Sequence, residues 1–217
     1  MEIGLLIVFW YGILHAFGPD HLTAITDFSI GRQRKRVMLI TLGFAIGHGV
    51  SLYLFALLLS NTPIPHEWLA YGDVVASSVI ILMGLYLLYL VFADKIHVSP
   101  HQHGAKTHMH IWIGKKNHDH SSKTTIRSWL SASATMGLLM GMGGARGMLI
   151  TLSALSHQAV SGWMVLSFTL GVALVFLIFG FAISVLNQRL VASEKILRGS
   201  FLTAGIVSCM VGGQILL

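Results

Sequence analysis

The chain has 217 residues, of which 54% are hydrophobic and only 10% are charged, and its formal net charge is +6. Soluble domains carry about a quarter of charged residues, so this composition excludes an ordinary soluble domain and predicts an all-α integral membrane protein. The basic residues flank apolar segments, so the positive charge does not indicate a nucleic-acid partner. A single cysteine, Cys209, excludes a disulfide within the chain.

The first apolar segment covers about residues 3–26. No basic region precedes its apolar run, so we expect no cleaved signal peptide. Near its middle stands HAFGPDH, in which Pro19 has no N–H and cannot bond the carbonyl of His15. The sequence therefore predicts a helix break at Gly18-Pro19, with the freed carbonyl facing a polar pocket.

Polar residues around this break form a candidate metal site. His15, Asp20 and His21 belong to the first segment, and the second segment (36–60) adds His48 between two glycines. Ionisable groups at this membrane depth are functional candidates by default. Imidazoles joined by a carboxylate suit nickel, cobalt, zinc, copper or iron better than magnesium or calcium.

The later segments complete a six-span pattern. We expect transmembrane helices at about residues 3–26, 36–60, 67–92, 128–156, 162–186 and 196–217. All basic residues but Arg146 follow the first, third or fifth span, and cytoplasmic loops collect lysine and arginine. The sequence thus predicts a multi-pass protein of the inner (plasma) membrane with both termini outside. Asp27 would then lie solvated at the cytoplasmic end of the first span.

The two halves of the chain are similar in sequence. Residues 12–26 align with 137–151, since Gly12 matches Gly137, and the FAIG of 44–47 resembles FTLG of 168–171. Each half has three spans, so the halves would face opposite ways. That is the inverted-repeat plan of many secondary transporters, whose sites lie at the midplane in broken helices.

This pattern divides the chain into three parts. Residues 1–92 form the first three-helix repeat, 93–127 a cytoplasmic loop, and 128–217 the second repeat. We expect helices 1 and 4 to be broken near the midplane, because glycines loosen span 4 at the positions that match the first break. These glycines are Gly141, Gly143, Gly144 and Gly147.

Two stretches together resemble a known family. HAFGPDH at 15–21 fits a His-x4-Asp-His signature, and LGFAIGHGVS at 42–51 places a Gly-His pair in the next span. This combination resembles the nickel/cobalt transporter superfamily, which includes urease-accessory-type permeases. The resemblance implies that the metal-site residues are His15, Asp20, His21 and His48.

The expected function is therefore secondary transport of a divalent transition metal, and not an enzymatic activity. The resemblance favours Ni²⁺ or Co²⁺ as the transported substrate, with no permanently bound cofactor, and it favours uptake over export. The chain contains no nucleotide-binding loop, so protons or the membrane potential would supply the energy. Protons compete with metal for histidine and carboxylate lone pairs, which offers one way to couple the two.

The long loop at 93–127 is rich in histidine. Histidine-rich tracts bind metals, so we interpret it as a cytoplasmic metal buffer that exchanges ions with the site or with a cytoplasmic metallochaperone. The alternative is a solvated linker with no metal role. Its histidines are His97, His101, His103, His108, His110, His118 and His120.

Arg146 keeps other functions open. It occupies the repeat position that matches His21 and lies within the fourth span, where it could form a gating ion pair with Asp20. It could instead bind the substrate of an anion or small-acid exporter. Histidines on facing spans could also ligate haem in a membrane redox protein.

Overall fold

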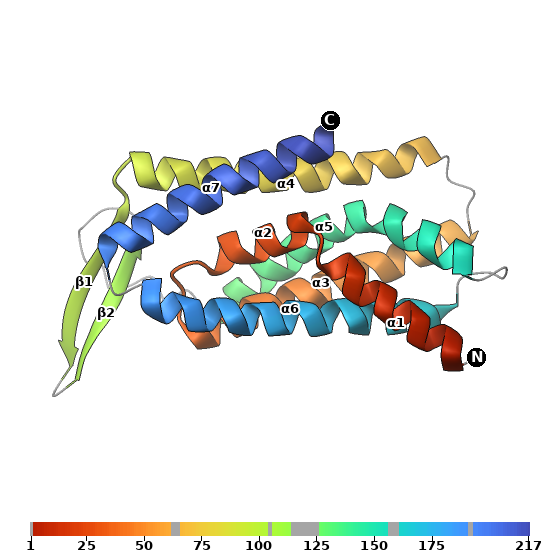
Figure 1. Ribbon diagram of the computed structural model, residues 1–217, viewed down its shortest axis with the longest axis horizontal. Helices are drawn as coiled ribbons and strands as arrows, with labels where there is room; N and C mark the ends of the chain where they lie inside the picture. The colour runs from red at the N-terminus through yellow and green to blue at the C-terminus, as the bar shows by residue number, and fades with distance from the viewer. Residues whose placement is uncertain (1, 62–65, 104–105, 114–125, 156–160, 191–192) are drawn as a thin grey trace.

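A computed structural model describes residues 2–61, 66–103, 106–113, 126–155, 161–190 and 193–217 (Figure 1). These residues form a predominantly helical bundle with one antiparallel hairpin, so the predicted all-α class holds for all but the hairpin. The elements are α1 (Glu2–Ala16), α2 (Pro19–Ser29), α3 (Arg34–Asn61), α4 (His66–Phe92), β1 (Ile96–His103), β2 (Lys106–Ile113), α5 (Ile126–Leu155), α6 (Gly162–Leu190) and α7 (Glu194–Leu216).

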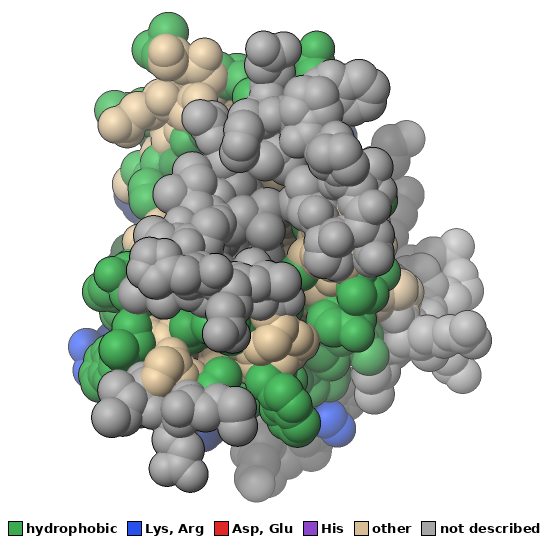
Figure 2. All heavy atoms as spheres, turned by 90° about the vertical axis from the view of Figure 1, so that its right-hand side faces the viewer, with side chains coloured by type: hydrophobic (Ala, Val, Ile, Leu, Met, Phe, Trp, Pro, Cys, Tyr) green, Lys and Arg blue, Asp and Glu red, His purple; other side chains and the backbone are tan. Residues whose placement is uncertain are grey.

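The composition of the helices confirms the membrane character of the chain. Four segments are long and apolar enough to cross a bilayer, namely Arg34–Leu58, Ala70–Phe92, Gly162–Leu190 and Glu194–Leu216. Large apolar side chains cover the outside of the bundle, with Phe92 78% exposed and Leu82 66% exposed. Figure 2 shows that hydrophobic side chains also dominate the described surface at the end of the bundle nearest the N-terminus. Such a surface is stable in lipid and not in water.

The predicted break in the first span is confirmed. Helix α1 ends at Ala16, and α2 begins at Pro19, where the missing N–H costs nothing because a first-turn N–H has no helical partner. The prediction that the His15 carbonyl lacks a hydrogen-bond partner is wrong, however. The N–H of Gly18 donates to the carbonyl of His15 at 3.0 Å, so a tight turn satisfies it.

The predicted break in the fourth span is wrong. Helix α5 runs without interruption from Ile126 to Leu155 through all four of its central glycines. A glycine costs about 1 kcal/mol in a helix but keeps its N–H, whereas an internal proline removes a hydrogen bond and clashes with the preceding turn. Glycine alone therefore did not break the helix.

The long loop contains a hairpin that the sequence analysis did not predict. Strands β1 and β2 pair antiparallel, with His97 opposite Trp112 and His101 opposite His108. The hairpin is attached to the bundle through Ile96, which is fully buried against Leu197 and Phe201 of α7.

The helices of the two halves pack mainly against each other. Helix α3 lies against α5 and α6, α4 lies against α7 and α5, and α1 lies against α6. Figure 1 shows the hairpin, the α2–α3 turn and the start of α7 at one end of the bundle, and the N-terminus at the other. The first of these ends carries Arg32, Arg34, Lys35, Arg36, Lys95, Lys195 and Arg198, and we call it the basic end.

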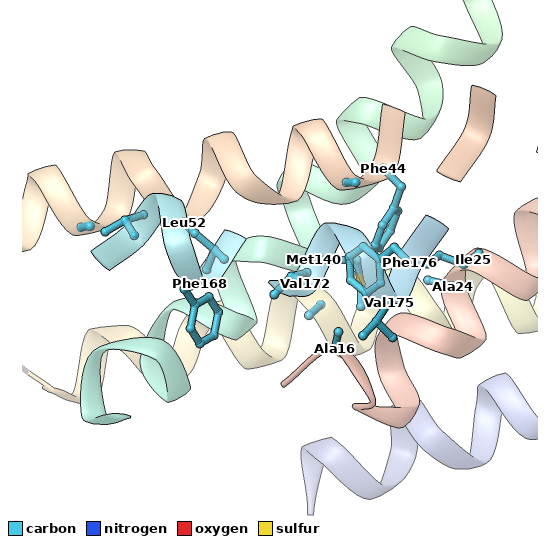
Figure 3. Close-up of a cluster of buried hydrophobic side chains, with 14 of the residues drawn as sticks. Ala16, Ala24, Ile25, Phe44, Leu52, Met140, Phe168, Val172, Val175 and Phe176 are labelled. Carbon is cyan, nitrogen blue, oxygen red and sulfur yellow. The ribbon is translucent and has the colours of Figure 1, made fainter. Parts of the chain in front are cut away.

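The main core fills the space between these helices. Figure 3 shows Phe44 of α3 and Phe176 of α6 side by side in this core, and their ring centroids are 5.2 Å apart in an edge-to-face arrangement. Ala16 and Ala24 come from either side of the break in the first span. The break thus lies inside the core, and polar side chains beside it are surrounded by apolar ones.

Candidate metal centre

Three of the predicted ligands converge at the break. His15 comes from the last turn of α1, His21 from the first turn of α2, and His48 from the middle of α3. The ring centroids of His15 and His21 are 4.8 Å apart, as are those of His21 and His48, while those of His15 and His48 are 5.8 Å apart. We call these three residues the histidine cluster.

The break is what brings the first two rings together. In a continuous helix, residues six apart are separated by about 9 Å along the axis and point in different directions. The turn at Gly18 removes this separation. A side chain on Gly18 would approach Asp20 Oδ1 within 2.5 Å and His21 Nδ1 within 2.8 Å, so this position needs glycine for space.

The ring nitrogens of the cluster are buried and available for a ligand. His21 is 2% exposed and His48 is fully buried. Within the described part of the chain, Nε2 of His15 and both ring nitrogens of His21 and of His48 have no hydrogen-bond partner. Each buried polar atom without a partner costs about 1–3 kcal/mol, and a cation shared between the rings would remove that cost.

The spacing of the cluster fits one ion after a small contraction. One ligand nitrogen from each ring can be chosen so that all three lie within 4.8 Å of one another. Two nitrogens that bind one ion at about 2.1 Å each are at most about 4.2 Å apart. The widest pair must therefore close by about 0.6 Å, which small side-chain rotations provide.

Asp20 takes a different position from the one predicted. Its Oδ1 lies 3.0 Å from Nδ1 of His21, its side chain is 20% exposed, and it is not part of the three-residue cluster. Carboxylates that accept from the far nitrogen of a ligating histidine fix its tautomer and strengthen it as a ligand. Here the contact is a close approach without hydrogen-bond geometry, and a small rotation of either side chain would let the Asp20 carboxylate accept from Nδ1 and leave Nε2 of His21 for an ion.

Aromatic rings from the second half enclose the cluster. The Phe168 ring lies 5.3 Å from that of His15, and the Phe176 ring lies 5.6 Å from those of His21 and His48. The sequence analysis did not assign these two residues to the site. The FAIG and FTLG stretches offered a signal for Phe168, because they begin with phenylalanine in both halves.

Helix α5 closes another side of the cluster with a glycine. A Cβ built on Gly144 would lie 2.8 Å from Nε2 of His15 and 3.4 Å from Cε1 of His48. The span predicted to break instead supplies a smooth backbone surface against the rings. The space beside His15 therefore depends on the absence of a side chain at this position.

Several predicted residues are not placed by the structure. Arg146 lies on α5, but its side chain is outside the described part, so the Asp20–Arg146 ion pair stays a prediction. For His101, His103, His108 and His110 only the strand backbone is described, and His118 and His120 lie outside the described residues. The metal-buffer interpretation therefore also stays a prediction.

Asp27 is buried, which contradicts the expectation of a solvated residue. It is 6% exposed, and one of its carboxylate oxygens accepts a hydrogen bond from the Ser208 hydroxyl of α7 at 2.5 Å. The prediction failed because α7, from the far end of the sequence, covers this part of α2. Asp27 lies on α2 between the histidine cluster and the basic end.

The site therefore consists of three imidazoles, an orienting carboxylate, and walls from the other half of the chain. Comparisons with protein-family models, with curated proteins and with solved structures found no match to this chain.

Proposed function

We propose that this chain is a secondary transporter of divalent transition-metal ions, with Ni²⁺ or Co²⁺ as its substrate. The observation that carries the proposal is the histidine cluster, in which three imidazoles with unpartnered nitrogens meet at a helix break inside an apolar core. Buried ionisable groups in a membrane protein mark ion pathways by default.

The donor set supports a transition metal. Imidazole nitrogens bind nickel, cobalt, zinc and copper, whereas magnesium and calcium prefer oxygen ligands. Three protein ligands leave further coordination positions for water, and a bound ion must be able to leave again for transport to occur. The resemblance of the two motifs to nickel/cobalt transporters narrows the proposal to Ni²⁺ and Co²⁺.

The contacts between helices support an inverted repeat of three spans in each half. A Cβ at Gly12 would meet the backbone carbonyl of Phe168, and a Cβ at Gly137 would meet that of Phe44. The two glycines are 125 residues apart and the two phenylalanines 124 apart. A glycine of the first half thus packs on a phenylalanine backbone of the second half, and the matching glycine of the second half packs on the matching phenylalanine of the first.

A second pair of contacts repeats this relation. A Cβ at Gly47 would meet the backbone carbonyl of Ala134, and a Cβ at Gly171 would meet that of Phe9. These partners are again separated by 124 and 125 residues. Small residues that let helix backbones approach closely are typical of membrane interfaces. In the proposed six-span arrangement, α1 and α2 together form the first span and the basic end faces the cytoplasm.

Metal flux into liposomes tests the proposal. We expect purified protein to carry Ni²⁺ or Co²⁺ across the bilayer, with flux that depends on a pH gradient if protons are the coupling ion. His21→Ala should reduce flux to the level of empty liposomes, because His21 contacts both other rings. His97→Ala is the matched control, since it removes a histidine on β1 outside the cluster.

Two results would contradict the proposal. One is folded wild-type protein that carries neither metal above the level of empty liposomes. The other is a His21→Ala variant that carries metal as fast as the wild type. In either case the anion alternative would be tested next with Arg146→Ala.

A further inference from the structure

The buried carboxylate of Asp27 has no role in the metal centre described above. It lies six residues beyond His21 on α2, which is about 9 Å along the helix axis. The Ser208 hydroxyl is hydrogen-bonded to Oδ2, while Oδ1 is buried and has no hydrogen-bond partner within the described residues. A carboxylate of this kind inside a membrane protein needs an explanation.

Among the side chains that the structure describes, no cation forms an ion pair with Asp27. The ion pairs found among the described side chains join Asp20 to His21 and Asp94 to Arg198, and neither involves Asp27. Burying an unpaired carboxylate in an apolar environment is strongly unfavourable. A bound proton removes the charge and provides a donor for an acceptor nearby.

The groups on the surrounding helices leave this charge uncompensated. On α7 the titratable neighbour is the Cys209 thiol, which lies within electrostatic range of Asp27. From α6, the Asn187 amide donates to the carbonyls of Ser29 and Arg32 in the α2–α3 turn. The Asn187 side chain is neutral, and its amide hydrogens are used in hydrogen bonds to that turn, so it does not balance the charge of Asp27.

Two cations at the basic end near α2 contact an aromatic ring of α5. The guanidinium carbons of Arg32, after α2, and Arg36, on α3, lie 4.4 Å and 5.9 Å from the centre of the Trp129 ring. From α4, Tyr86 lies within electrostatic range of Arg32. These cations are thus directed to the aromatic ring of α5 and do not form ion pairs with Asp27 in the described structure.

A cavity connects Asp27 with the basic end. It has a volume of about 530 Å³, lies between α2, α6 and α7, and is lined along α2 from Leu22 to Ile30. Polar side chains interrupt its apolar lining at Thr23, Thr26, Asp27, Asn187, Ser200 and Thr203. The lining is mostly apolar, but the volume far exceeds that of one water molecule and these polar side chains offer hydrogen-bond partners to water, which can carry a proton.

We propose that Asp27 is a proton-binding site between the histidine cluster and the basic end, and that its proton is the coupling ion of metal transport. The proton passes from water in the α2–α6–α7 cavity to a carboxylate oxygen of Asp27, which becomes neutral, and returns to water when Asp27 ionises. No other bond is made or broken. One carboxylate and one hydroxyl are too few oxygen ligands for a metal cation, which favours the proton as the ligand. The coupling role rests on the proposed transport function.

Asp27→Asn separates metal binding from coupling. Because the histidine cluster is unchanged, purified Asp27→Asn should bind Ni²⁺ within about twofold of the wild type. In liposomes at equal pH on both sides, it should still exchange Ni²⁺ for Ni²⁺. It should lose at least about tenfold of the accumulation that a pH gradient drives in the wild type. Asp94→Asn, an acid outside the bundle, is the matched control and should accumulate metal normally.

Infrared difference spectroscopy gives a readout that does not depend on transport. As pH is changed, wild-type protein should show a carbonyl band of a protonated carboxyl group that is absent from Asp27→Asn. Ser208→Ala should shift that band, because it removes the hydrogen bond to the carboxylate. If Asp27→Asn does not fold, the shift of the band in Ser208→Ala tests whether the band belongs to Asp27.

The outcomes distinguish the two proposals. Gradient-driven accumulation by Asp27→Asn equal to that of the wild type, or the absence of the carbonyl band, would overturn the proton site and leave Asp27 as a structural link to α7. Wild-type protein with no metal flux but with an Asp27-dependent band would overturn the transport function while keeping the proton site.

Discussion

The stretch 12–26 and the aligned stretch 137–151 of α5 share glycines at two matching positions, Gly12 with Gly137 and Gly18 with Gly143, yet the first stretch contains a helix break and α5 does not. One of the differences between them is Pro19, which stands where α5 has Gly144. The broken segment turns His15 and His21 inward, where both belong to the histidine cluster. The continuous helix presents a bare backbone against the same rings. In the proposed metal site, the first stretch would supply two ligands and the aligned stretch of α5 one wall, and Gly144 lets that wall lie close to His15.

Of the substitutions that test the contrast between the broken segment and α5, Gly144→Ala is expected to lower Ni²⁺ affinity the most. The added methyl group would lie 2.8 Å from Nε2 of His15, so the ring must move. Overpacking of this kind costs about 1–3 kcal/mol, and every 1.4 kcal/mol is about tenfold in affinity. We expect Ni²⁺ affinity, measured by calorimetry in detergent, to fall about tenfold to a hundredfold.

Gly213→Ala is the control for this prediction. Gly213 is also a helical glycine, on α7, and has nothing within 4 Å of its built Cβ. Its substitution should leave metal affinity unchanged. If Gly144→Ala binds Ni²⁺ as tightly as Gly213→Ala does, α5 is not a wall of the metal site.

A smaller effect is expected from Asp20→Asn, which tests the orienting role in the broken span. The substitution keeps the shape of the side chain beside Nδ1 of His21 but removes its negative charge. Removal of such outer partners costs about 10–100-fold in metal affinity. We expect about tenfold here, because Asp20 is partly exposed. A loss as large as that of His21→Ala in the same titration would instead make Asp20 a direct ligand.

The smallest effect is expected from Pro19→Ala. The ring restricts the unfolded chain, so its removal should lower the free energy of unfolding by about 0.4–1 kcal/mol. We expect the break to persist, because the turn at Gly18 also brings Asp20 and His21 together, and Ni²⁺ affinity to stay within about twofold. Chemical unfolding in detergent, followed by circular dichroism, measures the change. A gain in helicity with loss of metal binding would show that Pro19 alone maintains the break.

The local chemistry of the first half made much of its structure predictable. Proline has a strong and short-range effect, so the break at Gly18-Pro19 followed from the sequence. The convergence of His15, His21 and His48 followed from it, because the break turns the first two rings toward one place and the glycines beside His48 allow the second segment to come close. The exact role of Asp20 did not follow, since a carboxylate can serve as a ligand or orient one with the same spacing.

The wrong predictions, a break in the fourth span and a solvated Asp27, concern features that depend on contacts between distant parts of the chain. The continuity of α5 reflects packing against α3, where Gly137 and Gly141 allow close approach and offset a weak helix propensity. Asp27 was expected in water because Ser208, which covers it, is 181 residues away. The hairpin did carry a local signal that the sequence analysis did not use. Apolar residues alternate with polar ones at Ile96 and Val98 of β1, and Met109, Ile111 and Ile113 follow the same two-residue spacing in β2.

The glycine contacts join segments that are far apart in the sequence, so these segments are synthesised at different times. Gly12 is made 156 residues before Phe168, whose backbone it meets. Membrane proteins are inserted as they are translated, so the helices of the first half enter the lipid long before their partners exist. During this interval His21 and His48 lack the contact with Phe176, which forms only after α6 has been synthesised. Ribosome-bound chains that stop before α6 will therefore lack an enclosed histidine cluster, even though all three histidines are already present.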